Sequence, residues 1–132
     1  MIPPDGFESL GMPTKVVDAS VLGALIFGEP RAGEAAALLQ GADLYAPGLM
    51  SYELTHIAQK KSAQFPDQIS AFQEALEAAL LMGIRFRDVR QSAVLRLALE
   101  SGLTTYDACY LYLSRLLGAE LATFDERLLR VG

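Results

Sequence analysis

Short runs of apolar and β-branched residues alternate along this chain with longer segments of helical periodicity. The run from Lys15 to Asp18 has the β-branched character of a strand, whereas 49–62 and the segment after Pro66 place their apolar residues on one helical face. Strands that are separated by helices pair in parallel, and the helices then cover both faces of the sheet. The alternation therefore predicts a three-layer α/β fold, in which a central parallel sheet of about four to five strands is flanked by helices.

The expected strands are Lys15–Asp18, Leu44–Ala46, Ile84–Arg87 and Leu121–Thr123. The expected helices are 21–27, 31–40, 49–62, one between Pro66 and Gly83, 89–101, 105–117 and 125–130. Ser20 is expected to cap the first helix. The helix over 105–117 is apolar almost all round and is expected to be the most buried.

Residues 1–13 contain three prolines and two glycines and show no period. We expect a flexible lead-in over this stretch and one domain over 14–132. Met12 lies just ahead of the first strand, so whether Met1 or Met12 is the natural start stays open.

The composition is that of an ordinary globular domain, with 52% hydrophobic and 20% charged residues in 132. No stretch is apolar over the length of a membrane span, and the first residues do not resemble a signal peptide. The single cysteine, Cys109, excludes an internal disulfide, so a cytoplasmic location is expected. The net charge of −5 argues against nucleic-acid binding by bulk attraction, although local basic patches remain compatible with it.

Four acidic residues fall at the same end of the expected strands. Asp18 ends the first strand and Asp125 follows the last one. Glu53 lies in the opening turns of the helix that leaves the second strand, and Asp107 opens the helix that returns to the last strand. Because sites in parallel α/β folds form at the carboxyl ends of the strands, all four acids are expected at one edge of the sheet. If the first and last strands are neighbours, Asp18 and Asp125 flank the crevice between them.

A divalent cation is the simplest partner for these acids. Carboxylates in apolar sequence are costly to bury without a positive partner, and no lysine or arginine accompanies them. The absence of histidine and cysteine from the set favours Mg²⁺ or Mn²⁺ over zinc.

Each acid also has a simpler interpretation when it is taken alone. The segments 104–107 and 123–126 both resemble capping boxes, so Asp107 and Glu126 could serve only as helix caps. Glu53 could pair with Lys60, and Asp18 could belong to a turn. These interpretations do not explain why all four acids occur together.

The residues that carry these acids resemble the PIN domains, and within them the VapC-type toxins of bacterial toxin–antitoxin pairs. The matching segments, in order, are Val16-Val17-Asp18-Ala19-Ser20, Ser51-Tyr52-Glu53-Leu54, Leu103-Thr104-Thr105-Tyr106-Asp107-Ala108 and Leu121-Ala122-Thr123-Phe124-Asp125. Two features depart from the family: the chain stops at Gly132, where a final edge strand is common, and its charge is acidic for an RNA-binding enzyme.

The resemblance implies a Mg²⁺- or Mn²⁺-dependent endoribonuclease that cleaves single-stranded RNA. It also implies a homodimer and a small antitoxin whose tail fills the active-site groove. The catalytic and metal positions carry over as Asp18, Glu53, Asp107 and Asp125, and the accessory hydroxyl positions as Ser20 and Thr123.

Within this set Asp18 and Asp107 are expected to be the core ligands, directly or through water. Glu53 would hold or deprotonate a bound water, and Asp125 would complete one site or help to hold a second ion. The two hydroxyls would orient carboxylates or waters.

Alternative functions are a housekeeping PIN nuclease and a PIN-fold binding module without activity. A receiver domain of the response-regulator type is disfavoured. Such a domain needs an acidic pair before its first-strand aspartate and a lysine after a fifth strand, and this chain has neither.

Overall fold

The computed structural model of the chain describes residues 12–132. Four parallel strands form its sheet in the order β3-β2-β1-β4, which confirms the predicted α/β fold. The strands are β1 (Thr14–Val17), β2 (Asp43–Pro47), β3 (Arg85–Arg87) and β4 (Glu120–Ala122). Most of the expected lead-in lies outside the described residues, so its flexibility and the start residue stay predictions. No helix among residues 12–132 has the length and apolar character that a membrane span requires.

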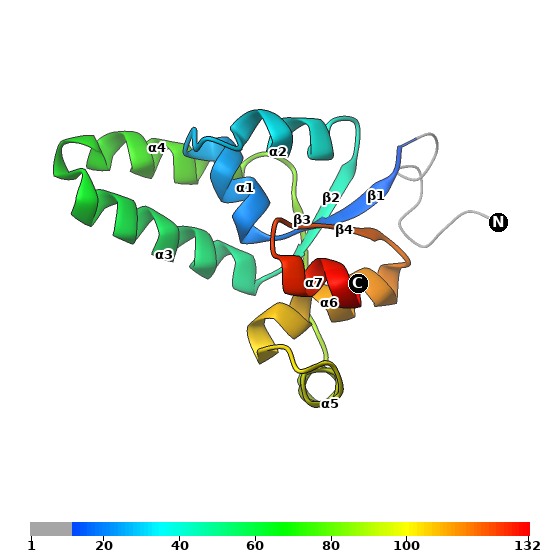
Figure 1. The fold of residues 1–132 in the computed structure, drawn as a ribbon. Helices are drawn as coiled ribbons and strands as arrows, with labels where there is room; N and C mark the ends of the chain where they lie inside the picture. The colour runs from blue at the N-terminus through cyan, green and yellow to red at the C-terminus, as the bar shows by residue number, and fades with distance from the viewer. Residues whose placement is uncertain (1–11) are drawn as a thin grey trace.

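Helices cover both faces of the sheet (Figure 1). On one side lie α1 (Ala19–Ile26) and α2 (Ala32–Leu39), together with the hairpin of α3 (Leu49–Gln64) and α4 (Ile69–Leu80), which the short 3₁₀ helix η2 (Pro66–Gln68) connects. On the other side lie α6 (Thr105–Leu117) and α7 (Glu126–Val131), and α5 (Gln91–Ser101) packs on α6. The α3–α4 hairpin projects beyond the sheet, at the left of Figure 1.

Strand β1 lies in the middle of the sheet and pairs with β2 on one side and β4 on the other. Val16 is aligned with Tyr45 of β2 and with Leu121 of β4, and Val17 with Ala122. The first and last strands are therefore neighbours, which is the condition for a crevice between their carboxyl ends.

The main core lies between β1, β2 and the helices α1 and α3. Val16, Leu22, Tyr45 and Leu54 are fully buried in it. Gly23 lets α1 and α3 approach closely, because a Cβ atom at this position would lie 3.1 Å from Cδ1 of Ile57. This approach sets how near α3, which carries Glu53, lies to the end of β1.

The start of α5 differs from expectation, and strand β3 is a short edge of the sheet. Phe86 is 39% exposed at this edge. The guanidinium carbons of Arg85 and Arg87 lie 5.8 and 5.2 Å from the centre of the Tyr45 ring. Helix α5 begins at Gln91 and not at Val89, because the backbone is still extended at the residue just before Gln91 (φ −81°, ψ 105°).

Candidate metal centre and active site

Asp18 joins strand β1 to helix α1 and is buried, with 5% of its surface exposed. Its backbone N–H continues the sheet by donating to the carbonyl of Ala122 (3.1 Å), and its Oδ1 accepts from the N–H of Val21 (3.2 Å). Asp18 is thus the N-cap of α1, and the expectation that Ser20 caps this helix is wrong. The helix begins at once because pairing with β4 ends at Val17, which leaves Ser20 in the first helical turn.

Two hydroxyl groups hold the Asp18 carboxylate from different segments. Ser20 Oγ donates to Asp18 Oδ1 (2.6 Å), and Thr123 Oγ1 donates a short hydrogen bond to Asp18 Oδ2. A carboxylate offers about four acceptor directions. The bonds from Ser20, Val21 and Thr123 occupy most of these acceptor directions. The direction that stays free is on Oδ2. The structure therefore brings both predicted accessory hydroxyls into contact with Asp18.

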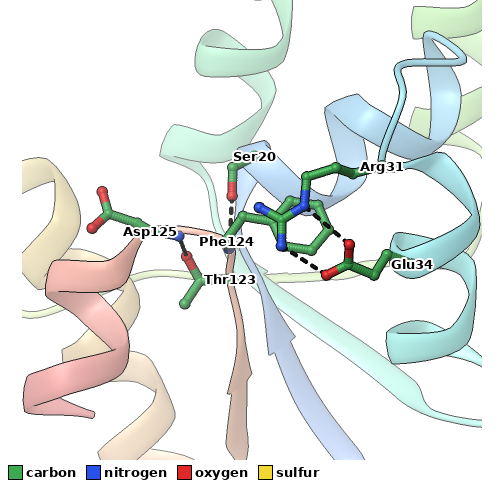
Figure 2. Close-up of polar contacts among 6 residues, drawn as sticks. All are labelled: Ser20, Arg31, Glu34, Thr123, Phe124 and Asp125. Atoms are coloured by element: carbon green, nitrogen blue, oxygen red, sulfur yellow. Dashed lines mark hydrogen bonds and ion pairs between the residues drawn. The ribbon is translucent and has the colours of Figure 1, made fainter.

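The connection from β4 to α7 is built from the same groups. The N–H of Phe124 donates to Ser20 Oγ (3.2 Å), and the N–H of Asp125 donates to Thr123 Oγ1 (2.9 Å), as Figure 2 shows. Asp125 Oδ1 caps α7 by accepting from the N–H groups of the second and third helical residues, at 2.8 and 3.2 Å. The expected capping box with Thr123 at its first position is therefore wrong, because Asp125 is the N-cap of α7 and the Thr123 hydroxyl accepts from the N–H of Asp125 instead.

Asp107 lies in the first turn of α6, where the helix dipole favours a negative charge. Thr104 caps this helix by accepting from the N–H of Asp107 (3.1 Å), as the capping-box pattern predicts. Burial is the main cause that raises the pKa of Asp107, and the charge of Asp125 raises it further. The hydrogen bond with Thr104 and the charge of Arg127 lower the pKa.

Glu53 is half-buried on α3 and meets Tyr110 of α6. The Tyr110 hydroxyl donates a short hydrogen bond to Glu53 Oε1. The partner of Glu53 is therefore Tyr110 and not Lys60. Tyr110 itself is buried, and its pKa is raised strongly by burial and by the charge of Glu53. The contact of Tyr110 with Glu53 was not predicted from the sequence. The available signal was its spacing from Asp107, which places both on one side of α6.

The four acids influence one another although they come from separate segments. Burial raises the pKa of Glu53, and the charges of Asp107 and Asp18 raise it further. Asp125 acts in the same way on Asp107. Such repulsion weakens with distance, so Glu53 lies near Asp107 and Asp18, and Asp107 lies near Asp125.

No cation neutralises these acids by an ion pair within residues 12–132. The ion pairs of this region join Lys15 to Glu120, Arg31 to Glu34 and Lys61 to Glu29. Burial is also the main cause that raises the pKa of Asp18, and its hydrogen bonds oppose this effect only in part. The edge therefore carries uncompensated negative charge.

The residues fit a hard divalent cation by their chemistry. In the part of the chain that the structure describes, no three histidine, cysteine, aspartate or glutamate side chains converge on one point closely enough to hold an ion. The donors are all oxygen atoms, which suits Mg²⁺ or Mn²⁺, ions that keep several water ligands. A site of this kind uses one or two direct carboxylates and reaches the others through water.

Other polar side chains of α3 and α6 take no part in these hydrogen bonds. His56 is exposed on α3. Cys109 is half-buried on α6, and burial raises the pKa of its thiol, which disfavours a nucleophilic role. A cleft of about 890 Å³ opens between the ends of β2 and β3 and the helices α5 and α6, and Tyr106 and Cys109 line it.

A parallel sheet of this order, with acids gathered at the carboxyl ends of its strands, defines the class of PIN-like α/β domains. The family model of the PIN domain matches residues 15–132. The chain belongs to this family, as the sequence resemblance predicted.

Relatives with known names agree with the family. Ribonuclease VapC3 of Pyrobaculum aerophilum is 29% identical over 124 residues, which cover 86% of this chain and 90% of the relative. The crystal structure of PAE2754 from Pyrobaculum aerophilum has a TM-score of 0.75 at 27% identity and covers 92% of this chain and 86% of that chain. The structure of Mycobacterium tuberculosis VapC20, a toxin that cleaves the sarcin–ricin loop, has a TM-score of 0.66 over 89% of this chain and 95% of that chain. Its identity of 18% supports likeness of the fold alone. The chain is thus a distant homologue of VapC ribonuclease toxins.

Proposed function

We propose that this protein is a divalent-metal-dependent endoribonuclease that cleaves single-stranded RNA, and that it is the toxin of a VapBC-type toxin–antitoxin pair. The observation that carries the proposal is the placement of Asp18, Glu53, Asp107 and Asp125, which lie at the end of β1, in the first turns of α3 and α6, and at the start of α7 after β4. The distant homology to a ribonuclease of the VapC group supports the same activity.

Asp18 and Asp107 would hold the metal, with Glu53 and Asp125 beside them. A bound Mg²⁺ or Mn²⁺ ion would neutralise phosphate charge and lower the pKa of a water molecule bound to it. The protein itself keeps the Asp18 carboxylate in one orientation through Ser20 and Thr123. This restraint matters because a ligand that can rotate loses affinity for the ion.

Glu53 would orient the attacking water and accept its proton. Its Oε1 is occupied by the hydroxyl of Tyr110, so Oε2 is the oxygen directed to this task. The water oxygen would form a bond to phosphorus while the bond from phosphorus to the 3′ oxygen breaks. The leaving 3′ oxygen would take a proton from solvent water, so the products would be a 5′-phosphate and a 3′-hydroxyl.

A cleavage assay tests the proposal. Wild-type protein, Asp18→Asn and the control Asp67→Asn, which changes an exposed acid of η2, are incubated with single-stranded RNA and Mg²⁺ or Mn²⁺. We expect cleavage by the wild type and the control, and a loss of about a hundredfold or more in Asp18→Asn. Equal cleavage by all three proteins would mean contamination, and no cleavage by any would favour a PIN-fold binding module.

The VapC relationship also supports a homodimer, a small antitoxin partner and action in the cytoplasm. Leu95 and Leu99 lie one turn apart on α5 and are 55% and 77% exposed, which makes this helix a candidate association surface. Light scattering of the purified protein tests dimer formation, with Leu99→Glu as the variant expected to shift the mass toward the monomer. A short upstream gene for a DNA-binding protein would support the antitoxin.

A further inference from the structure

A second cleft lies beside the acidic edge. It has a volume of about 680 Å³ and opens between α1, α3 and the connection from β4 to α7. Ser20 and Phe124 line the side next to Asp18, and Arg31, Lys60 and Lys61 supply positive charge. Two of these cations are paired with acids, Arg31 with Glu34 and Lys61 with Glu29, and Glu29 also lines the cleft.

Arg31 and Phe124 form a flat stack at this cleft. The guanidinium carbon lies 3.7 Å from the centre of the Phe124 ring, as Figure 2 shows. At this distance the guanidinium lies flat on the ring, because an edge-on group would drive its nitrogen atoms into the ring. Glu34 fixes the orientation with two hydrogen bonds, from Arg31 Nε (3.2 Å) and Nη2 (2.7 Å).

Much of the surface of the Arg31 and Glu34 side chains is open to solvent. The side chain of Arg31 is 52% exposed and that of Glu34 is 59% exposed. Because Glu34 neutralises the guanidinium, Arg31 is a weak anchor for a phosphate group. What remains is a rigid planar surface, and a guanidinium plane is one of the surfaces on which unpaired nucleobases stack.

The stack is attached directly to the acidic site. The N–H of Phe124 donates to Ser20 Oγ (3.2 Å), and Ser20 donates to Asp18 Oδ1 (2.6 Å). Phe124 also lies between Thr123 and Asp125, and Figure 2 shows its ring on the opposite side of this segment from the Asp125 carboxylate. A base on the stack would therefore be held at a constant offset from the acids.

The charges beside the stack suit a nucleic-acid strand. Lys61 pairs with Glu29 (2.7 Å), whereas the exposed Lys60 has no hydrogen bond or ion pair with any residue of 12–132. Lys60 is therefore available to a backbone phosphate, a contact that positions a strand without reading its sequence. A flat surface for one base and a cation for a neighbouring phosphate fit single-stranded RNA better than a peptide side chain.

We propose that Arg31 and Phe124 form a stacking surface that holds one nucleobase of the single-stranded RNA substrate next to the cleavage site. The inference rests on the proposed function, because it assigns a substrate subsite to that activity. Both residues position the substrate and take no part in the chemistry.

The test uses RNA oligonucleotides that carry a single 2-aminopurine, whose fluorescence is quenched when it stacks. The base is moved along the strand, and the wild type is compared with Arg31→Lys and Phe124→Leu. Arg96→Lys is the matched control, because Arg96 is exposed on α5 and does not line this cleft. We expect strong quenching at one position with the wild type and the control, and its loss in both cleft variants.

Kinetics on the same strands separates positioning from folding. With the wild type, an abasic nucleotide at the quenched position should raise KM roughly tenfold, because one base stack is lost. The same substitution should change kcat by less than about twofold. With Arg31→Lys the KM should already be raised and the abasic substitution should add little. Cleavage without position-specific quenching would overturn the stacking surface and leave the proposed function intact.

The reverse outcome is also informative. Quenching that depends on Arg31, in a protein that cleaves no RNA, would support the stacking surface and contradict the nuclease. Unchanged quenching and KM in Arg31→Lys, together with weaker self-association, would overturn the inference in favour of a protein contact.

Discussion

Thr123 donates a hydrogen bond to the buried carboxylate of Asp18 across 105 positions of the chain. The bond ties the carboxyl end of β4 to that of β1, the two strands between which the acidic edge opens. It also places a hydroxyl group against the acid that the sequence predicts to be a core metal ligand.

Removal of this hydroxyl is expected to destabilise the protein. Thr123→Val keeps the shape of the side chain but leaves Asp18 Oδ2 and the N–H of Asp125 without their partner. We expect a loss of about 1–3 kcal/mol in the free energy of unfolding, measured by urea denaturation. Thr123→Ser retains the hydroxyl and should lose much less. Equal losses in the two variants would show that the methyl group, and not the hydrogen bond, matters.

Asp18→Asn should weaken the stabilisation of the protein by metal. The substitution relieves a buried charge, but the amide nitrogen of the new side chain would be an N–H donor facing a donating partner such as the Thr123 hydroxyl, so the two effects on the stability of the metal-free protein oppose each other. Mg²⁺ or Mn²⁺ at about 100 times its Kd should stabilise the wild type by about 2.7 kcal/mol and the variant much less. Thermal unfolding of both proteins with EDTA and with metal measures this difference. A wild type that does not respond to either ion would contradict the metal site.

The metal-free protein should become less stable as pH rises from acidic values. Asp18, Glu53 and Asp107 have raised pKa values in the folded state, so the folded protein holds more protons than the unfolded chain. Their stabilisation is present at low pH and is lost as pH rises above the ordinary values, 3.8 for aspartate and 4.5 for glutamate.

Urea denaturation in EDTA at a series of pH values measures this slope. The slope should be shallower in Asp18→Asn, which lacks one of the three groups. An identical slope in the variant would remove Asp18 from the explanation, whereas the exposed control Asp67→Asn should leave the slope unchanged.

Tyr110→Phe should move the pH dependence of RNA cleavage. The Tyr110 hydroxyl lowers the pKa of Glu53 through its hydrogen bond, so its removal should raise that pKa. Because Glu53 is proposed to act in its ionised form, the acidic limb of the pH–rate profile should shift to higher pH. Tyr112→Phe, on the same helix, is the control and should leave the profile unchanged. A profile that does not move in Tyr110→Phe would argue against Glu53 as the proton acceptor.

Local patterns were enough to predict the fold and the edge at which the acids gather. The periods of strands and helices are properties of short segments, and their alternation implies a parallel sheet. The position of each acid at a strand end or a helix start then follows from the chain order. The error at Ser20 has the same origin: Asp18 and Ser20 are both good caps, and the choice depends on where pairing between β1 and β4 stops.

Contacts between distant segments could not be read from these patterns. The bond from Tyr110 to Glu53 spans 57 positions and depends on how α3 and α6 cross the sheet. The exposure of Phe86 depends on β3 being an edge strand, and the stack of Arg31 on Phe124 depends on how the start of α2 meets the end of β4.

The sequence by itself determined a parallel α/β domain with Asp18, Glu53, Asp107 and Asp125 at one edge, because periodicity and chain order are local information. Only the tertiary structure decided which groups hold and surround these acids, namely Thr123 on Asp18 and Tyr110 on Glu53. Packing makes that choice, since a side chain's partner is set by the angle and separation of whole elements and not by its neighbours in the chain.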